Sequence, residues 1–203
     1  MIEPATRENA AMPTVAIVYY SSTGHTHELA LAAERGVQTV SDTKAVLVRL
    51  QDADIQNGRW KNDEQLATCS AADAILFGTP TYMGGYSAQM KAFIDATGGI
   101  WFQQGWKGKW AAGFTHSQGL SGDKLNSLAG LWINAMQHGM IWIGPGVMVS
   151  GTDPALANRL SSYSGAMAQS FPPNAPVSAG DVETVELLGK RLAEAVARWA
   201  KGA

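Results

Sequence analysis

The sequence predicts an α/β protein in which an open, doubly wound parallel sheet lies between two layers of helices. Two observations lead to this fold class. Five short runs rich in β-branched and aromatic residues alternate with segments whose apolar residues recur at helical spacing. The first run, residues 14–20, is apolar without alternation, as expected of a strand that is covered on both faces. Strands that alternate with helices in this way pair in parallel through right-handed crossovers.

The first half of the chain supplies three of the expected strands, at residues 14–20, 44–50 and 73–78. A turn rich in Ser, Thr and Gly follows the first strand. The helix after it carries an apolar stripe formed by Leu29, Ala33, Val37 and Val40. Gly, Pro and Thr mark a turn after the third strand, and the next helix has an apolar face formed by Met90, Phe93 and Ile94.

The second half supplies the strands at residues 109–115 and 140–144. The helix between them is predicted from the spacing of Leu125, Leu128, Trp132, Ala135 and Met136, and Gly139 is well placed to end it. Residues 145–179 are rich in Gly, Ser and Pro, which indicates irregular surface structure. A final helix is predicted from a capping-box-like start at Ser178 and Asp181 and from the stripe Val185, Leu188, Leu192, Val196 and Trp199.

Composition narrows the class of protein. The 203 residues are expected to form one domain, 1–203, with residues 1–12 as a flexible extension. A net charge of -2 without a basic stripe argues against nucleic-acid binding. The single cysteine, Cys69, has no disulfide partner and is expected to be a buried thiol. Because no secretory signal and no membrane-spanning apolar run are found, the protein is expected to be cytoplasmic.

Four hydroxyl side chains surround Gly24 in the turn after the first strand: Ser21, Ser22, Thr23 and Thr26. The turn stands at the N-terminus of a helix, where free backbone N–H groups and the helix dipole favour an anion. Glycine lets the backbone close around that anion, and the hydroxyls add donors. The pattern therefore predicts a phosphate site. The alternative is that these hydroxyls only cap the helix and form a turn.

The absence of two nucleotide-binding motifs narrows the choice of ligand. No GxGxxG follows the first strand and no GxxxxGK[ST] occurs, which argues against a Rossmann-bound dinucleotide and a nucleoside triphosphate. Flavin mononucleotide (FMN) remains as the predicted ligand. Residues 79–85 (TPTYMGG) add a stiffening proline, small residues, and two side chains that can pack on an aromatic ring. Taken alone, this loop fits an ordinary Gly/Pro connection equally well.

Five motifs carry a resemblance to a known family: YSSTGHT at 20–26, GTPT at 78–81, QMKAFID at 89–95, TGGIW at 97–101 and HGM at 138–140. Over residues 14–146 the chain is similar to the flavodoxin-like WrbA-type NAD(P)H:quinone oxidoreductases of the NADPH-dependent FMN reductase superfamily. The resemblance implies a flavodoxin-like three-layer fold. Its five-stranded parallel sheet would have the order 2-1-3-4-5, with FMN at the carboxyl ends of the strands.

The resemblance also implies which residues contact the cofactor. The phosphate would be held by Ser21, Thr23, Gly24, His25 and Thr26. The ring and ribityl chain would meet Thr79, Pro80, Thr81, Tyr82, Met83 and Gly84, and a third loop would contribute Thr115, His116, Ser117 and Gly119. Tyr82 and Met83 stand where the family often has Arg-Phe, and the loss of an arginine could change the preference for a phosphorylated nicotinamide.

Two further residues are candidates for the catalytic centre. His138 falls at a predicted helix end, where it could also serve as a cation that stabilises the helix dipole, and the resembled family places this histidine near the flavin. Trp101 lies in an aromatic insertion at residues 98–108. In the resembled family, which is tetrameric, this tryptophan approaches the flavin of a neighbour. A homo-oligomer, dimer or tetramer, is therefore expected, with core packing as the alternative explanation for Trp101.

The leading hypothesis is an FMN-dependent oxidoreductase that transfers a hydride from NADH or NADPH to a quinone-like acceptor. No metal site is expected, because the spacing in His25-Thr26-His27-Glu28 does not match a ligand motif. The first alternative is an electron-carrier flavodoxin. A second alternative is a flavin-free interaction module with the same fold.

Overall fold

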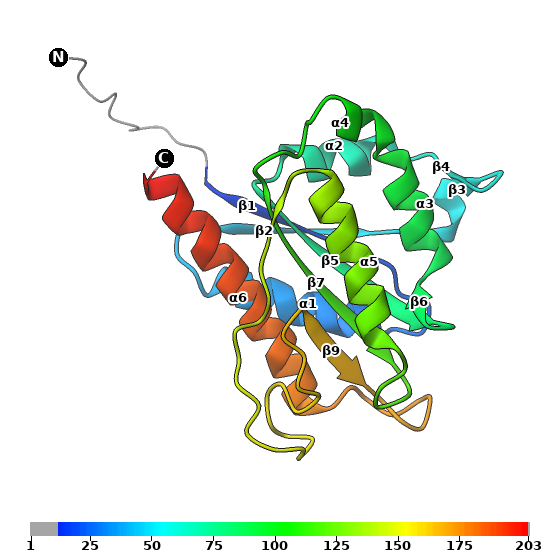
Figure 1. Cartoon of the computed structure of the whole chain (residues 1–203), viewed down its shortest axis with the longest axis vertical. Helices are drawn as coiled ribbons and strands as arrows, with labels where there is room; N and C mark the ends of the chain where they lie inside the picture. The colour runs from blue at the N-terminus through cyan, green and yellow to red at the C-terminus, as the bar shows by residue number, and fades with distance from the viewer. Residues whose placement is uncertain (1–11, 203) are drawn as a thin grey trace.

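A computed structural model describes residues 12–202, so the expected extension at 1–12 lies outside the described residues except for Met12. Five strands run in parallel in the order β2-β1-β5-β7-β8 (Figure 1). They are β1 (Thr14–Tyr19), β2 (Lys44–Arg49), β5 (Ala74–Tyr82), β7 (Trp110–Ser117) and β8 (Ile141–Trp142). In the register, Ile17 lies opposite Leu47 on one side and Leu76 on the other. The predicted α/β flavodoxin-like fold with a parallel sheet is confirmed.

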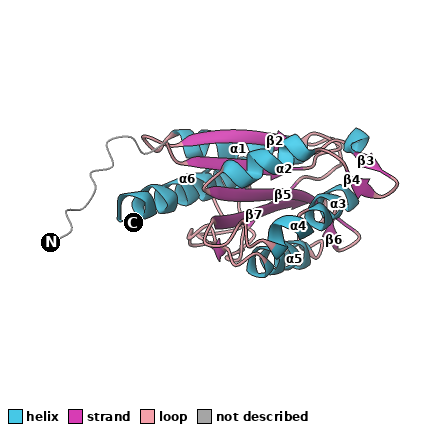
Figure 2. Cartoon of the chain, turned by 90° about the horizontal axis from the view of Figure 1, so that it is seen from above, coloured by secondary structure: helices cyan, strands magenta, loops and turns pink. Residues whose placement is uncertain are grey.

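Helices cover both faces of the sheet. The helices α1 (His25–Gln38) and α6 (Ala179–Gly202) pack on one face. On the other face lie α2 (Asp63–Ala71), α3 (Ala88–Ala96), the short α4 (Gly98–Phe102) and α5 (Lys124–Gln137). Figure 2 shows α3, α4 and α5 close together, away from α6. None of the helices within residues 12–202 is long and apolar enough to cross a membrane.

The central strand β1 explains this layering. Val15 and Ile17 belong to the core under α1 and α6, whereas Ala16 and Val18 belong to the core under α2, α3 and α5. Because successive side chains of a strand point to opposite faces, a strand buried on both faces must be apolar throughout. Cys69 of α2 is buried in the second core, as expected, and burial raises the pKa of its thiol to about 12.

Two glycines allow α1 and α6 to cross closely. A Cβ atom at Gly36 would lie 1.9 Å from the carbonyl oxygen of Glu186, and one at Gly189 would lie 2.3 Å from that of Ala33. Any side chain at either position would therefore force the two helices apart. This close crossing fixes the C-terminal half of α1 against α6.

The expected strand order applies only in part, because the sheet holds additional strands. After β5, the two-residue β6 (Gly85–Tyr86) turns back as a hairpin. The strand β8 pairs with the beginning of β7, and β9 (Ala166–Gln169) pairs in parallel with its end. Residues 145–179 are thus not irregular throughout, as the composition had suggested. A four-residue strand is too short for periodicity to reveal.

Other local predictions need correction. The strand expected at 73–78 continues to Tyr82, and the sequence reading missed α2, a 3₁₀ turn (Asp52–Asp54) and a small hairpin of β3 (Ile55–Gln56) and β4 (Arg59–Trp60). The final helix starts where expected, but Asp181 does not form the capping box. Its carboxylate instead accepts two hydrogen bonds from Arg159 and one from the backbone N–H of Gln169.

Candidate active site

Three loops meet at the carboxyl edge of the sheet, after β1, β5 and β7, and enclose a cavity of about 440 Å3. This volume lies within the usual range for small-molecule sites. Ten predicted site residues line it: Thr23, His25, Pro80, Thr81, Tyr82, Met83, Gly84, His116, Ser117 and Gly119. Gln118, Gly122, Pro173 and Asn174 complete the lining. None of these four was named as a predicted contact, although Gln118 and Gly122 lie in the predicted third loop and the two prolines before Asn174 are a recognisable turn signal.

The first loop ends at Gly24, the N-cap of α1, whose φ of 98° lies in the left-handed region. No side chain caps this helix. The Ser21 hydroxyl accepts a hydrogen bond from the Gly24 N–H at 3.2 Å, within the turn itself. Of the alternative that the hydroxyls only cap the helix and form a turn, the capping half is therefore wrong, whereas Ser21 does form a turn. An uncapped helix end leaves its first backbone N–H groups available to an anion.

Two stacked imidazoles join the first loop to the third. The His25 and His116 rings lie 4.6 Å apart, centroid to centroid. Nε2 of His25 donates to the Ala175 carbonyl at 3.0 Å, and its Nδ1 lies 3.0 Å from the Thr23 hydroxyl. Burial, aided by the positive fields of His25 and Lys124, lowers the pKa of His116 to about 4. The stack therefore contains a neutral His116 at neutral pH.

The second loop is a tight hairpin between β5 and β6. Its two central residues, Met83 and Gly84, have φ values of 47° and 77°. Positive φ at both positions is the requirement of a type I′ turn, in which glycine is favoured and methionine is unusual. The Met83 side chain is fully exposed at the cavity rim. The Tyr82 hydroxyl lies 2.5 Å from that of Ser22, which links this loop to the first.

Buried hydroxyls fix the second and third loops to each other. Thr115 donates to the Thr79 carbonyl at 2.7 Å, and its hydroxyl lies 2.8 Å from that of Thr81. Thr79 and Thr115 are fully buried and are absent from the cavity lining, as are the nearly buried Ser21 and Thr26. Thr79 and Thr115 hold the second and third loops together, and Ser21 holds the turn of the first. Gly24 is also absent from the lining. Direct contact of these residues with a cofactor stays a prediction.

The two catalytic candidates lie at the opposite edge of the sheet. His138 follows α5 and is held beside the start of β7, where Gly108 donates to the Gly139 carbonyl at 3.0 Å. The strand β7 spans eight residues, so this edge is roughly 25 Å from the cofactor loops. Trp101, which is half exposed, and His138 line one shallow cavity of about 310 Å3 there. The fold brings them together but not to the cavity of their own chain.

The surroundings of His138 are unusual. Its Nε2 lies 2.8 Å from the Thr97 hydroxyl and its ring lies 4.5 Å from that of Trp106. The buried atoms Nδ1 of His138 and Nδ2 of Asn134 have no hydrogen-bond partner within residues 12–202. Burial lowers the pKa of His138, so it does not act as the helix-end cation that the sequence suggested. Of the aromatic insertion, Trp106 is core, whereas Trp101 and Phe102 are exposed.

The residues at the three loops fit a flavin mononucleotide. Space is open around Gly24, where an added Cβ would meet nothing within 4 Å, and the uncapped end of α1 supplies donors for a phosphate. Pro80, Tyr82 and Met83 offer apolar surface to a planar ring. A flavodoxin-like fold whose loops at this edge fit FMN defines a flavin-binding class of protein.

Comparison with known proteins identifies the family. The model of the family described as NADPH-dependent FMN reductase matches residues 13–154. The chain belongs to this family, of the WrbA type. It is an oxidoreductase whose cofactors are FMN and NAD(P)H.

Individual relatives carry two kinds of name, flavodoxin and NAD(P)H dehydrogenase (quinone). Flavodoxin FldP of Pseudomonas aeruginosa is 39% identical over 189 residues, which cover 90% of this chain and 96% of that protein. An NAD(P)H dehydrogenase (quinone) of Archaeoglobus fulgidus is 32% identical over 197 residues, 90% of this chain and 97% of that one. The crystal structure of a WrbA-like flavodoxin from Agrobacterium tumefaciens superposes with a TM-score of 0.71 at 38% identity, covering 92% of this chain and 98% of that chain.

Proposed function

We propose that this protein transfers a hydride from NADH or NADPH to a quinone-like acceptor, with FMN as the intermediate carrier in a two-step turnover. One observation carries the proposal: the uncapped N-terminus of α1 faces a cavity at which three loops converge. The relatives named NAD(P)H dehydrogenase (quinone) support the choice of acceptor. The cytoplasm, which holds reduced nicotinamides, is the compartment that this reaction requires.

The residues of the chain would bind and orient the cofactor, whereas bound FMN would supply the redox chemistry. The backbone at Thr23 and Gly24 would hold the phosphate, and Tyr82 and Met83 would pack against the ring. His116, which is neutral at physiological pH, would place an uncharged imidazole beside the cofactor. The two cores share one sheet, which favours a single domain as the working unit.

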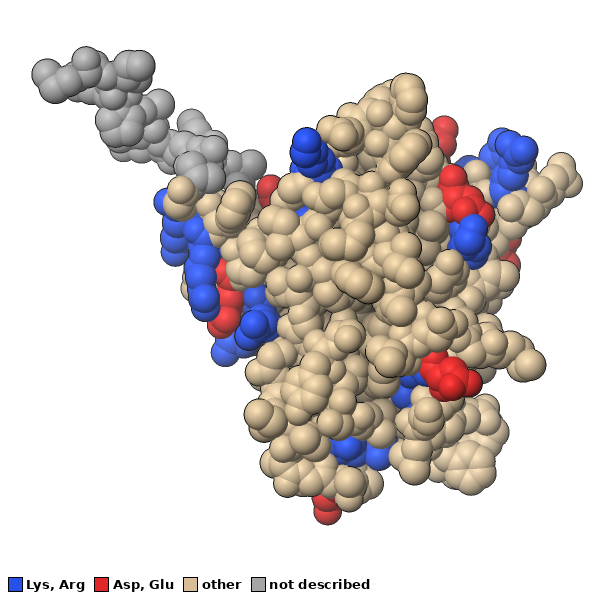
Figure 3. Space-filling view, in the orientation of Figure 1, with Lys and Arg blue, Asp and Glu red and all other residues tan. Residues whose placement is uncertain are grey.

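A homo-oligomer would complete the site. Trp101 and His138 lie too far from the cavity of their own chain, yet their surroundings contain buried polar atoms that lack a partner. The helix α5 exposes Leu125, Trp132, Ile133 and Met136, and Figure 3 shows that the face over α5 is almost free of charged side chains. An apolar face of this kind marks an interface. A second copy docked there would bring Trp101 and His138 toward a neighbouring cofactor.

Stopped-flow spectroscopy tests the proposed reaction. The FMN-loaded protein is mixed with NADH or NADPH, and the bleaching of the flavin absorbance is followed. A benzoquinone is then added to restore the absorbance. The expected result is reduction by at least one nicotinamide and full reoxidation by the quinone. No reduction by either nicotinamide at millimolar concentration would contradict the proposal.

An electron-carrier flavodoxin is the second candidate, because the relative that is 39% identical over 189 residues carries the name flavodoxin. A carrier exchanges single electrons with a protein partner. A redox titration separates the two: one two-electron wave supports the reductase, whereas two well-separated one-electron waves support the carrier. The nearly neutral formal net charge of -2 favours the reductase, since carriers of this kind usually present an acidic face.

A further inference from the structure

The third cofactor loop is built around a buried lysine. Lys124 is the first residue of α5, and its side chain is completely inaccessible to solvent. Its ammonium group donates to the Ser117 hydroxyl at 2.9 Å, to the Gly119 carbonyl at 2.6 Å and to the Leu120 carbonyl at 2.9 Å. All three donors of the ammonium are therefore used, and every acceptor belongs to one loop.

A positive charge is energetically unfavourable at this position for two reasons. Burial of an ammonium is costly, and the N-terminus of a helix repels cations. No carboxylate among residues 12–202 lies within ion-pair distance of Lys124. The carboxylate whose field acts on Lys124 is that of Asp181 on α6, and Arg159 binds it at 2.8 Å. A buried charge retained at such a cost, with all its bonds directed to a single loop, indicates a role in that loop.

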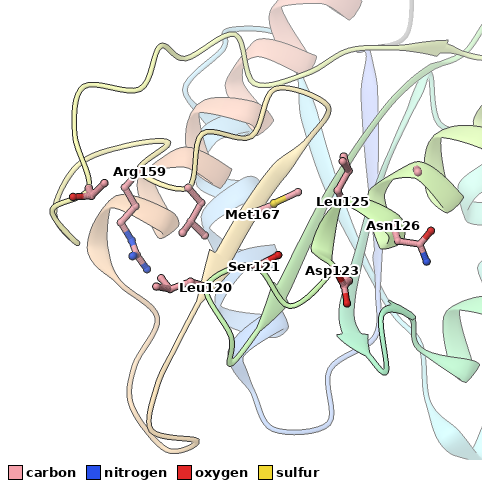
Figure 4. A pocket seen from close by; sticks show the side chains of 10 residues that line it. Leu120, Ser121, Asp123, Leu125, Asn126, Arg159 and Met167 are labelled. Carbon is pink, nitrogen blue, oxygen red and sulfur yellow. The ribbon is translucent and has the colours of Figure 1, made fainter.

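The loop itself is a wall between two cavities. Ser117, Gly119 and Gly122 line the cofactor cavity. Leu120 and Ser121, from the same loop, line a second cavity of about 1150 Å3, which Figure 4 shows beside Arg159. With space on both sides, the loop has few other supports. One of its remaining hydrogen bonds is donated by the side-chain amide of Gln169 to the Gln118 carbonyl at 2.7 Å.

We propose that Lys124 is a positioning residue, whose buried ammonium holds residues 117–122 in the shape that receives the flavin ring and places a positive charge behind it. The inference rests on the proposed function, because the ring is assigned to this cavity there. A hydride brings two electrons and one proton, so the ring gains one negative charge when no second proton follows. A nearby cation would favour that reduced state.

The charge of Lys124 depends on pH near neutrality. Burial lowers the pKa of Lys124 to about 8, opposed by Asp181 and reinforced by Arg159. His116, on β7, is the other titratable group that interacts with it, and His116 is neutral in this range. Raising the pH from 7 to 9 therefore removes the ammonium charge from the wall of the cavity. FMN affinity is expected to fall several-fold over this interval, and a variant without Lys124 would lack this change.

The test uses Lys124→Met, which keeps the length of the side chain but removes charge and donors. Lys124→Gln keeps an amide donor without the charge and serves the same test where Lys124→Met fails to fold. The control is Lys61→Met, at an exposed lysine remote from the cavity lining. We measure amide hydrogen exchange of residues 117–122 in the FMN-free full-length protein, the FMN dissociation constant by fluorescence quenching, and the two-electron midpoint potential.

In Lys124→Met we expect faster exchange at residues 117–122, FMN binding at least tenfold weaker, and a lower midpoint potential than in the wild type. Lys61→Met should match the wild type in all three. Wild-type exchange rates and a dissociation constant within twofold of the wild type would overturn the positioning role. An unchanged potential would overturn the electrostatic role. If the wild type binds no FMN, the proposed function fails, while exchange in the FMN-free protein still decides whether Lys124 holds the loop.

Discussion

The imidazoles of His25 and His116 stack at a centroid distance of 4.6 Å, with their planes inclined by 19°. His25 begins α1 and His116 lies near the end of β7, so the stack connects two of the three loops at the cavity. Each ring also binds the segment after β9: His25 reaches the Ala175 carbonyl and His116 the Ser170 hydroxyl. The two histidines thus close one side of the cavity, where the lowered pKa of His116 leaves that ring uncharged at neutral pH.

Acid is expected to destabilise the protein through His116. The pKa of this buried histidine is about 4 in the folded chain and near its usual 6.5 when unfolded. Between these values the unfolded state binds more protons, so the stabilising contribution is complete above pH 6.5 and is lost as the pH falls toward 4. From pH 7 to 5, the FMN-free protein should lose about 2 kcal/mol of unfolding free energy through this group.

Urea unfolding of wild type and His116→Gln at both pH values measures this contribution. The variant should lose less stability than the wild type over the same interval. His138, whose pKa is also lowered by burial, is present in both proteins and cancels in the comparison. Equal losses in the two proteins would contradict the prediction.

The phosphate loop is tested by Gly24→Ala. Gly24 has a φ of 98°, so alanine there is strained by about 1 kcal/mol or more. Reshaping the turn misdirects the backbone N–H groups, and FMN binding measured by fluorescence quenching should weaken at least tenfold. Gly58→Ala is the matched control, because Gly58 has a φ of 73° and equally open space, but lies in the β3–β4 turn. It should cost similar stability and leave FMN affinity unchanged.

Tyr82 separates hydrogen bonding from ring packing at the second loop. Tyr82→Phe removes the 2.5 Å contact with the Ser22 hydroxyl but keeps the aromatic ring, and a single exposed hydrogen bond contributes about 1 kcal/mol. FMN affinity should therefore fall by no more than about tenfold. Tyr82→Ala removes the ring as well and should weaken binding further. Isothermal titration of both variants with FMN measures the difference, and equal affinities would show that the ring contributes nothing.

The parts of this protein that could be predicted from its sequence are the local ones. The apolar run of β1 and the hydroxyl-rich turn after it are contiguous in the chain, so pattern and chemistry reveal them together. The spacing on α5 was harder to interpret. Leu128 and Ala135 are buried, whereas Leu125, Trp132 and Met136, which were assigned to the same stripe, are exposed. Apolar spacing alone does not distinguish a core from an interface.

Features created by tertiary contact could not be predicted. Pro173 and Asn174 reach the cavity only because β9 pairs with the end of β7. Lys124 is buried by a loop that folds back over it, although a lysine at the first position of a helix, against the dipole, was a signal that could have been noticed. The distance of His138 from the cavity follows from the direction of α5, which runs back to the opposite edge of the sheet.

Trp101 and His138 give the most decisive prediction, because one chain cannot bring them to its own cavity. Two variants test whether the sites of a two-fold dimer are shared. Gly24→Glu cannot bind the phosphate and should be inactive. The double variant Trp101→Ala, His138→Ala should also be inactive. A mixed dimer would nevertheless contain one intact site, formed by the wild-type loop of one copy and the wild-type Trp101 and His138 of the other. Random exchange of subunits should then restore about one quarter of wild-type quinone reductase activity.

The measurement is steady-state oxidation of NAD(P)H with a benzoquinone, before and after the two variants are unfolded and refolded together. Size-exclusion chromatography with light scattering establishes that each variant has the oligomeric state of the wild type. Each variant refolded alone is the control and should stay inactive. Activity of the mixture equal to the mean of the two separate variants would mean that every site is built from a single chain, and Trp101 and His138 would then act only in assembly.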